Sequence, residues 1–153
     1  MLLADLKKPL VAIIGKEGKM RFSLKELLQA GSHKWEESEV DAVTLRNLED
    51  LCRKINRLGF QPARYASSCL RSLKDQKRIN PSAMGSSHLY GCAVDIADPD
   101  GGLTRWIQTS IGRAKLEECG LWAEDPKYTK GKNGPWVHLQ TYMVKSGKRI
   151  FTP

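Results

Sequence analysis

The strongest constraint on the fold comes from two short segments in which apolar residues alternate with polar ones. In residues 92–97, "CAVDIA", every second residue is apolar or a cysteine, and Asp95 belongs to the opposite set. In residues 135–140, "PWVHLQ", the same alternation sets His138 apart from two apolar neighbours. Because successive side chains of a strand point to opposite faces of a sheet, we expect two half-buried strands. Each would carry a residue able to bind a metal on the face opposite its core side.

The remaining segments complete an α+β pattern. Ser23 and Glu26 form a capping-box signature at the start of a short helix over residues 22–30, which Gly31 would end. Two further helices are predicted over residues 41–59 and 103–119. One strand is predicted to begin near residue 60, with a break at Pro62, and three others cover residues 92–96, 121–124 and 135–142. Residues 75–85 are predicted to form a loop. We therefore predict a small single α+β domain over residues 1–153, with N-terminal helices packed on a mostly antiparallel sheet whose open face carries the cleft with Asp95 and His138.

The helix predicted over residues 41–59 is amphipathic. Its apolar residues recur mostly at steps of three and four, as expected for one buried helical face, and Gly59 ends the pattern. The predicted buried residues are Val43, Leu48, Leu51, Cys52, Ile55 and Leu58. This helix is expected to contribute to the core and to carry no chemistry.

The charge balance limits the classes of partner. The chain has 25 basic and 17 acidic residues, a net charge of +8, which favours an anionic partner such as nucleic acid, a membrane surface or an anionic cell wall. No finger, basic helix or RNA-binding aromatic motif is present, so no nucleic-acid partner is expected. No apolar run approaches the ~20 residues that span a bilayer. Residues 10–14 are apolar, but no signal-peptide pattern follows them, so we expect synthesis in the cytoplasm without a signal peptide.

Two of the three histidines stand where they could share a metal with Asp95. Gly91 permits a sharp turn, so His88, seven residues before Asp95, can fold back towards it. His138 would approach from the second strand. Two imidazoles and one carboxylate leave a fourth position open, which is typical of catalytic zinc sites and of their chemistry, activation of water and polarisation of a carbonyl. On the residues alone, a buried structural role for each histidine remains the alternative.

The stretch Ser86-x-His88-x-x-Gly91-x-Ala93-x-Asp95 resembles a motif of the zinc peptidases that cut bacterial cell walls. These are the D-Ala-D-Ala carboxypeptidases and dipeptidases and the L-alanyl-D-glutamate endopeptidases, including those of phage endolysins. The segment "WVHLQ" resembles their third-ligand segment, and "YASSCLRS" resembles their segment that ends in an arginine. The resemblance covers residues 20–142 approximately.

The resemblance implies one Zn²⁺ per chain on His88, Asp95 and His138, and it implies that Arg71 binds substrate or stabilises developing negative charge. Many members carry an acidic residue three positions before the last histidine, where this chain has Pro135. The base would then be Glu124 or Asp125, and the residues leave that choice open.

Three further residues near the predicted ligands are candidates for the substrate cleft. Ser86 is expected to support His88 or the motif's backbone, and Tyr90 and Trp136 either line the cleft or pack in the core or at its rim.

The resulting hypothesis is a zinc metallopeptidase that hydrolyses an amide in the peptide stem of peptidoglycan. A phage or prophage product is expected, acting on the wall as a released lysin or as a virion component in contact with other virion components. The alternative is a non-catalytic wall-binding or virion structural protein that keeps the peptidase fold, and a basic nucleic-acid-binding domain is a third hypothesis based on charge alone.

Overall fold

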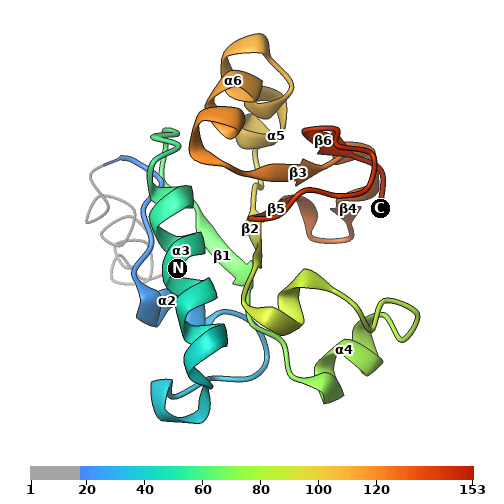
Figure 1. Ribbon diagram of the computed structural model, residues 1–153. Coiled ribbons are helices and arrows are strands. Elements are labelled where there is room, and N and C mark those ends of the chain that lie inside the picture. Colours follow the sequence, from blue (N-terminus) through green and yellow to red (C-terminus); the bar gives the residue numbers. More distant parts are fainter. Residues whose placement is uncertain (1–17) are drawn as a thin grey trace, which may run out of the picture.

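The computed structural model describes residues 18–153 (Figure 1). The prediction that the chain has no signal peptide concerns the apolar segment 10–14, which lies outside the described residues. Within the described part of the chain, no helix combines the length and the apolar character needed to cross a membrane.

Two N-terminal helices form as the sequence predicts. Helix α2, Leu24–Gln29, begins with the predicted capping box, in which the Ser23 hydroxyl accepts a hydrogen bond from the Glu26 amide and the Glu26 carboxylate accepts one from the Ser23 amide. Helix α3, Ala42–Asn56, is capped by Asp41 and buries Leu48, Leu51, Ile55 and the following Leu58 in the core.

Val43 is the residue of this predicted buried face that the structure contradicts, since it is 62% exposed. It precedes Leu48 by five residues, and at 3.6 residues per turn this step rotates a side chain by about 140° around the helix. Val43 therefore lies far from the stripe that contacts the sheet.

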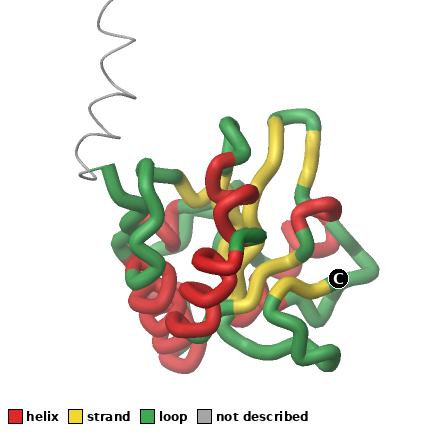
Figure 2. Tube along the Cα trace, turned by 90° about the horizontal axis from the view of Figure 1, so that it is seen from above, coloured by secondary structure: helices red, strands yellow, loops and turns green. Residues whose placement is uncertain are grey.

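The sheet confirms the predicted α+β class. Its strands are β1 (Tyr65–Ser68), β2 (Ala93–Ala97), β3 (Trp122–Glu124), β5 (Gly134–Gln140) and β6 (Ile150–Phe151), in the order β1-β2-β5-β3-β6, and β4 (Lys130–Gly131) pairs with β5. Every pair is antiparallel except β3 with β6. The predicted hairpin of β3 and β5 is present, whereas β6 was not predicted. Seen from above, most of the helical chain lies to one side of the strands (Figure 2).

The prediction of a loop over residues 75–85 is partly wrong, because the first residues of this segment belong to helix α4, Leu73–Ile79. The Ser72 hydroxyl caps this helix by accepting a hydrogen bond from the Asp75 amide. Only one residue of the helix, Gln76, is buried. A helix with so little apolar surface gives no periodic signal, which explains the incorrect prediction.

The single helix predicted over residues 103–119 is two helices, α5 (Gly102–Ile107) and α6 (Ser110–Cys119). The Thr109 hydroxyl starts the second helix by accepting a hydrogen bond from the Gly112 amide. A Cβ atom at Gly112 would lie 1.9 Å from the Trp106 carbonyl oxygen, so only glycine fits this junction.

Three single-turn 3₁₀ helices complete the secondary structure of residues 18–153: η1 (Glu37–Glu39), η2 (Ser87–Tyr90) and η3 (Pro126–Tyr128). Gly91 ends η2 in the left-handed conformation, with φ +74°, as the sharp turn before β2 was predicted to require. A Cβ atom there would also lie 2.9 Å from the Thr44 carbonyl oxygen of α3. The glycine thus permits the close approach of η2 to α3.

Candidate metal centre

Strands β2 and β5 bring two of the predicted ligands face to face. They pair antiparallel with Asp95 directly opposite His138, and the two side chains lie on the same face of the sheet. Asp95 sits between Val94 and Ile96, both fully buried, so its backbone is fixed by the core. The His138 Nδ1 atom lies 2.9 Å from Asp95 Oδ1.

The third residue, His88, comes from η2. The turn at Gly91 directs its ring back over β2, where His88 Nε2 lies 3.2 Å from the same Asp95 Oδ1 atom. Its Nδ1 atom lies 2.7 Å from the Cys69 carbonyl oxygen. The ring centroids of the two histidines are 5.1 Å apart and nearly perpendicular.

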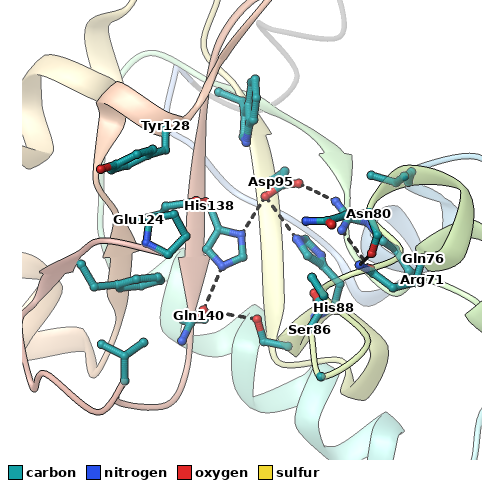
Figure 3. A pocket seen from close by; sticks show the side chains of 18 of the residues that line it. Arg71, Gln76, Asn80, Ser86, His88, Asp95, Glu124, Tyr128, His138 and Gln140 are labelled. Carbon is teal, nitrogen blue, oxygen red and sulfur yellow. Dashed lines mark hydrogen bonds and ion pairs between the residues drawn. The ribbon is translucent and has the colours of Figure 1, made fainter.

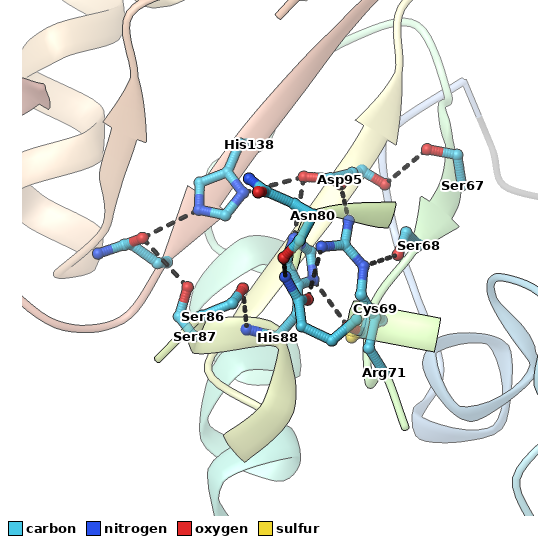
Figure 4. Close-up of polar contacts among 12 residues, drawn as sticks. Ser67, Ser68, Cys69, Arg71, Asn80, Ser86, Ser87, His88, Asp95 and His138 are labelled. Carbon is cyan, nitrogen blue, oxygen red and sulfur yellow. Dashed lines mark hydrogen bonds and ion pairs between the residues drawn. The ribbon is translucent and has the colours of Figure 1, made fainter. Parts of the chain in front are cut away.

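The hydrogen bonds on the far side of each ring decide which nitrogen carries the proton (Figure 4). A carbonyl oxygen can only accept, so His88 Nδ1 donates to Cys69 and leaves a lone pair on Nε2. His138 Nε2 lies 2.9 Å from the Gln140 Oε1 atom, which also only accepts, and this leaves a lone pair on Nδ1. Both lone pairs therefore face Asp95.

This donor set fits a divalent metal ion. One ligand atom from each of His88, Asp95 and His138 lies within 4.8 Å of the others, and all three residues are buried. Two imidazole lone pairs and a carboxylate directed at one point would repel without a cation or a proton between them, whereas zinc is commonly held by such ligands. The triad is consistent with one bound metal.

Arg71 holds the other oxygen of Asp95. Its Nη2 atom lies 3.0 Å from Asp95 Oδ2, its Nε donates to the Ser68 hydroxyl, and its Nη1 donates to Gln76 Oε1. The guanidinium also lines the pocket beside the triad. Arg71 thus orients the carboxylate so that Oδ1 is the atom presented to the histidines.

The three side chains of the triad shift one another's pKa values. Burial alone would raise the pKa of Asp95, but the two histidines outweigh it and hold that pKa well below its usual range. Burial lowers the pKa of His88 despite the attraction of Asp95. Burial also lowers the pKa of His138, but the hydrogen bond with Asp95 and the charge of Asp95 outweigh burial, so the pKa of His138 is raised. Asp95 is therefore ionised near neutral pH, as a metal ligand must be.

An open pocket of about 600 Å³ lies over the triad (Figure 3). Its wall includes Ser86, Glu124, Trp136 and Arg71 from the residues singled out in the sequence. The Ser86 hydroxyl accepts a hydrogen bond from the His88 amide, which supports η2 as expected. Burial raises the pKa of the Glu124 carboxyl, and the neighbouring His138 opposes this shift.

Two candidates from the sequence lie outside the pocket wall. The Asp125 carboxylate caps η3 by accepting a hydrogen bond from the Lys127 amide, and it lies 4.0 Å from Lys127 Nζ. Tyr90 is 53% exposed, while its carbonyl oxygen accepts a hydrogen bond from Asn47.

Two glutamines that contact the site, Gln76 and Gln140, were not among the residues predicted from the sequence. Gln140 could have been singled out, because it follows His138 by two residues and so lies on the same face of a strand. Gln76 carried no signal, since its helix was not recognised. Tyr128 and Phe151 also line the pocket, and the Phe151 ring lies edge-on to His138 at 6.2 Å between centroids.

Comparison with known proteins gives one structural likeness. No family model matches the chain, and no curated protein matches it. A solved structure of the Serratia marcescens L-Ala D-Glu endopeptidase ChiX resembles it with 24% sequence identity and a TM-score of 0.42. The match covers 82% of this chain and 100% of that chain.

Proposed function

We propose that this protein is a zinc-dependent peptidase that hydrolyses an amide bond in the peptide stem of bacterial peptidoglycan. The observation that carries the proposal is the meeting of His88, Asp95 and His138, with two imidazole lone pairs directed at one carboxylate, in the floor of an open pocket. The substrate class comes from the resemblance of residues 86–95 and 136–140 to wall peptidases.

His88, Asp95 and His138 would hold the ion. When bound, zinc supplies polarisation of the scissile carbonyl and activation of water. The residues around it bind and orient the substrate and move protons. A metal with two neutral imidazoles and one carboxylate, next to the Arg71 cation, also gives the pocket floor a positive charge that suits an anionic stem peptide.

We assign the role of general base to Glu124. Its carboxylate lines the pocket, and burial favours its proton-accepting function by raising its pKa. It would take a proton from the attacking water as the water oxygen bonds to the carbonyl carbon. It would then pass the proton to the amide nitrogen as the carbon–nitrogen bond breaks. Asp125 is the weaker candidate because its carboxylate is engaged with Lys127.

Arg71, Trp136 and Ser86 complete the proposed substrate site. Arg71 has five N–H groups and uses three of them in its hydrogen bonds to Ser68, Gln76 and Asp95, so the guanidinium can also donate to a substrate carboxylate or a developing oxyanion. Trp136 and Ser86 would form the walls. Tyr90, which is exposed, would contact substrate only outside the pocket.

A second candidate function is a non-catalytic wall-binding or virion structural protein. Pro135 motivates it, because this residue stands in β5 where many of the resembling peptidases carry an acid. An origin in a phage or prophage, a role as lysin or virion part and synthesis in the cytoplasm stay predictions based on the sequence. The net charge of +8 supports the anionic wall as partner.

The test is mass spectrometry of purified peptidoglycan after digestion by the zinc-loaded protein, with Asp95→Ala as the inactive variant. The proposal expects stem fragments with a new amino terminus from the wild type and none from Asp95→Ala. Zinc-loaded wild-type protein that releases no fragment from walls of several stem chemotypes would favour the non-catalytic function. Equal cleavage by Asp95→Ala would place the activity elsewhere.

A further inference from the structure

We infer that Gln140 is a positioning residue of the metal centre, which fixes the imidazole proton of His138 on Nε2 and so keeps Nδ1 free for the metal. This inference rests on the metal site of the proposed function, but on neither its substrate nor its reaction. The relevant contacts can be followed in Figure 3.

The orientation of the Gln140 amide is set by the main chain. Its Nε2 atom donates to the Tyr142 carbonyl oxygen at 3.1 Å. Because a carbonyl oxygen only accepts, the nitrogen end of the amide must face Tyr142, and Oε1 must face the opposite way. The Ser87 hydroxyl donates to this Oε1 atom at 3.2 Å, which holds the oxygen in place from a second side.

The fixed oxygen then selects one tautomer of His138. Gln140 Oε1 lies 2.9 Å from His138 Nε2, so a hydrogen bond forms only when Nε2 carries the proton. The other neutral tautomer would set the Nε2 lone pair against the Oε1 lone pairs. Water cannot easily replace the lost contact, because Gln140 is 5% and Ser87 6% exposed. A His138 that carries its proton on Nε2 alone therefore offers its Nδ1 lone pair to a metal ion beside Asp95, whose carboxylate otherwise favours a proton on Nδ1.

The same logic operates at His88 through a different group. There the Cys69 carbonyl accepts from Nδ1 and directs the Nε2 lone pair at Asp95. The main chain thus performs for His88 what Gln140 performs for His138. Outer hydrogen-bond partners of this kind commonly change metal affinity by about 10–100-fold when removed.

The experiment measures zinc affinity by competition with a chromophoric chelator. Gln140→Leu removes the acceptor at nearly constant size, Gln140→Glu restores an acceptor oxygen, and Gln108→Leu removes an exposed glutamine as the matched control. We expect about 10–100-fold weaker zinc binding for Gln140→Leu. Gln140→Glu should recover most of the affinity, and Gln108→Leu should match the wild type. Thermal unfolding of the zinc-free variants establishes that each is folded.

Nuclear magnetic resonance of the zinc-loaded protein adds a readout that a purely structural role would not change. The wild type should show a His138 Nε2 proton that exchanges slowly with water, and Gln140→Leu should lose that protection. Zinc affinity of Gln140→Leu within twofold of the wild type, a Gln140→Glu variant as weak as Gln140→Leu, or a wild type that binds no zinc would each overturn the inference. Failure to digest peptidoglycan would overturn only the proposed function.

Discussion

At the scale of single residues, the site depends on which atoms keep a lone pair. The acceptors behind His88 and His138 take the proton of each ring on its far side, and both remaining nitrogens approach one oxygen of Asp95. Arg71 occupies the other oxygen. The point between the three ligands therefore suits a cation. Glu124 lines the same pocket as His138 and is the proposed general base.

Glu124→Gln should lower kcat for a purified stem peptide by about 10²–10⁴-fold, because the amide cannot accept a proton from water. Zinc affinity should change little, since Glu124 is not among the three ligands. Asp125→Asn is the matched control, and it should retain most of the activity because this carboxylate lies outside the pocket wall. Release of new amino groups measures both rates. A large loss in Asp125→Asn with an active Glu124→Gln would reverse the assignment.

The strand period was enough to predict that Asp95 and His138 share a face, because alternation is a local property of the chain. The structure brings these residues and His88 together, while metal binding by them stays a prediction. The hydrogen bond from His88 to the Cys69 carbonyl joins segments 19 residues apart, and no local pattern encodes it. The pocket position of Glu124 also depends on how β3 pairs with β5 and β6.

At the scale of elements, a buried ion pair between Arg64 and Asp98 joins the start of β1 to the end of β2, and Asp98 also binds the first turn of α5. Asp98 is fully buried and accepts hydrogen bonds from Arg64 Nε at 2.8 Å and from the amides of Leu103 and Thr104. Arg64 is 5% exposed and directly precedes β1. Burial alone would raise the pKa of Asp98, but the donors outweigh it and lower that pKa below its ordinary value of 3.8. This network anchors the strand that carries Asp95.

Asp98→Asn should destabilise the fold by about 3 kcal/mol at neutral pH, because it removes the buried charge partner of Arg64 and leaves only the exposed Asp100 as an ion-pair partner. A carboxyl with a lowered folded pKa stabilises the fold above its unfolded pKa and loses that contribution as pH falls through the folded pKa. The stability gap between wild type and Asp98→Asn should therefore be constant near pH 7 and narrow below about pH 3.8. Urea denaturation across pH measures it. A gap that widens towards acid would contradict this assignment.

Elements with strong local signals were predicted well, and the others were missed for identifiable reasons. The capping box of α2 is confirmed, and so is most of the buried face of α3, except that Val43 is exposed and Cys52 is half-buried. Helix α4 lacks an apolar face, and the break between α5 and α6 depends on the contact of Gly112 with the Trp106 carbonyl. The two residues of β6 are too few for any period to appear.

At the scale of the whole molecule, the sheet order puts the two ligand-bearing strands side by side at its centre. Strands β2 and β5 are neighbours, with β1 and β3 outside them, although 36 residues separate Ala97 from Gly134. The antiparallel class was predictable from the short predicted strands and their hairpin, whereas the strand order and the parallel β6 pair depend on long-range packing. The chain as a whole carries a net charge of +8.

Binding to purified cell walls should weaken severalfold when salt rises from about 0.1 to 1 M, because the screening length falls from about 10 to 3 Å. Glu124→Gln is the suitable form, since it should bind without digesting the wall. Sedimentation of the protein with wall fragments gives the bound fraction, and walls stripped of anionic polymers serve as the control. Binding that does not change with salt would show that charge does not hold the protein on the wall.

The central claim, that one metal ion is held by His88, Asp95 and His138, is tested most directly by zinc titration followed by calorimetry. We predict one zinc per chain for the wild type and for His33→Ala, because His33 lies beside Trp35 and Glu39, apart from the triad. His88→Ala and His138→Ala should each lose tight binding. Unchanged zinc stoichiometry and affinity in both of these variants would contradict the account.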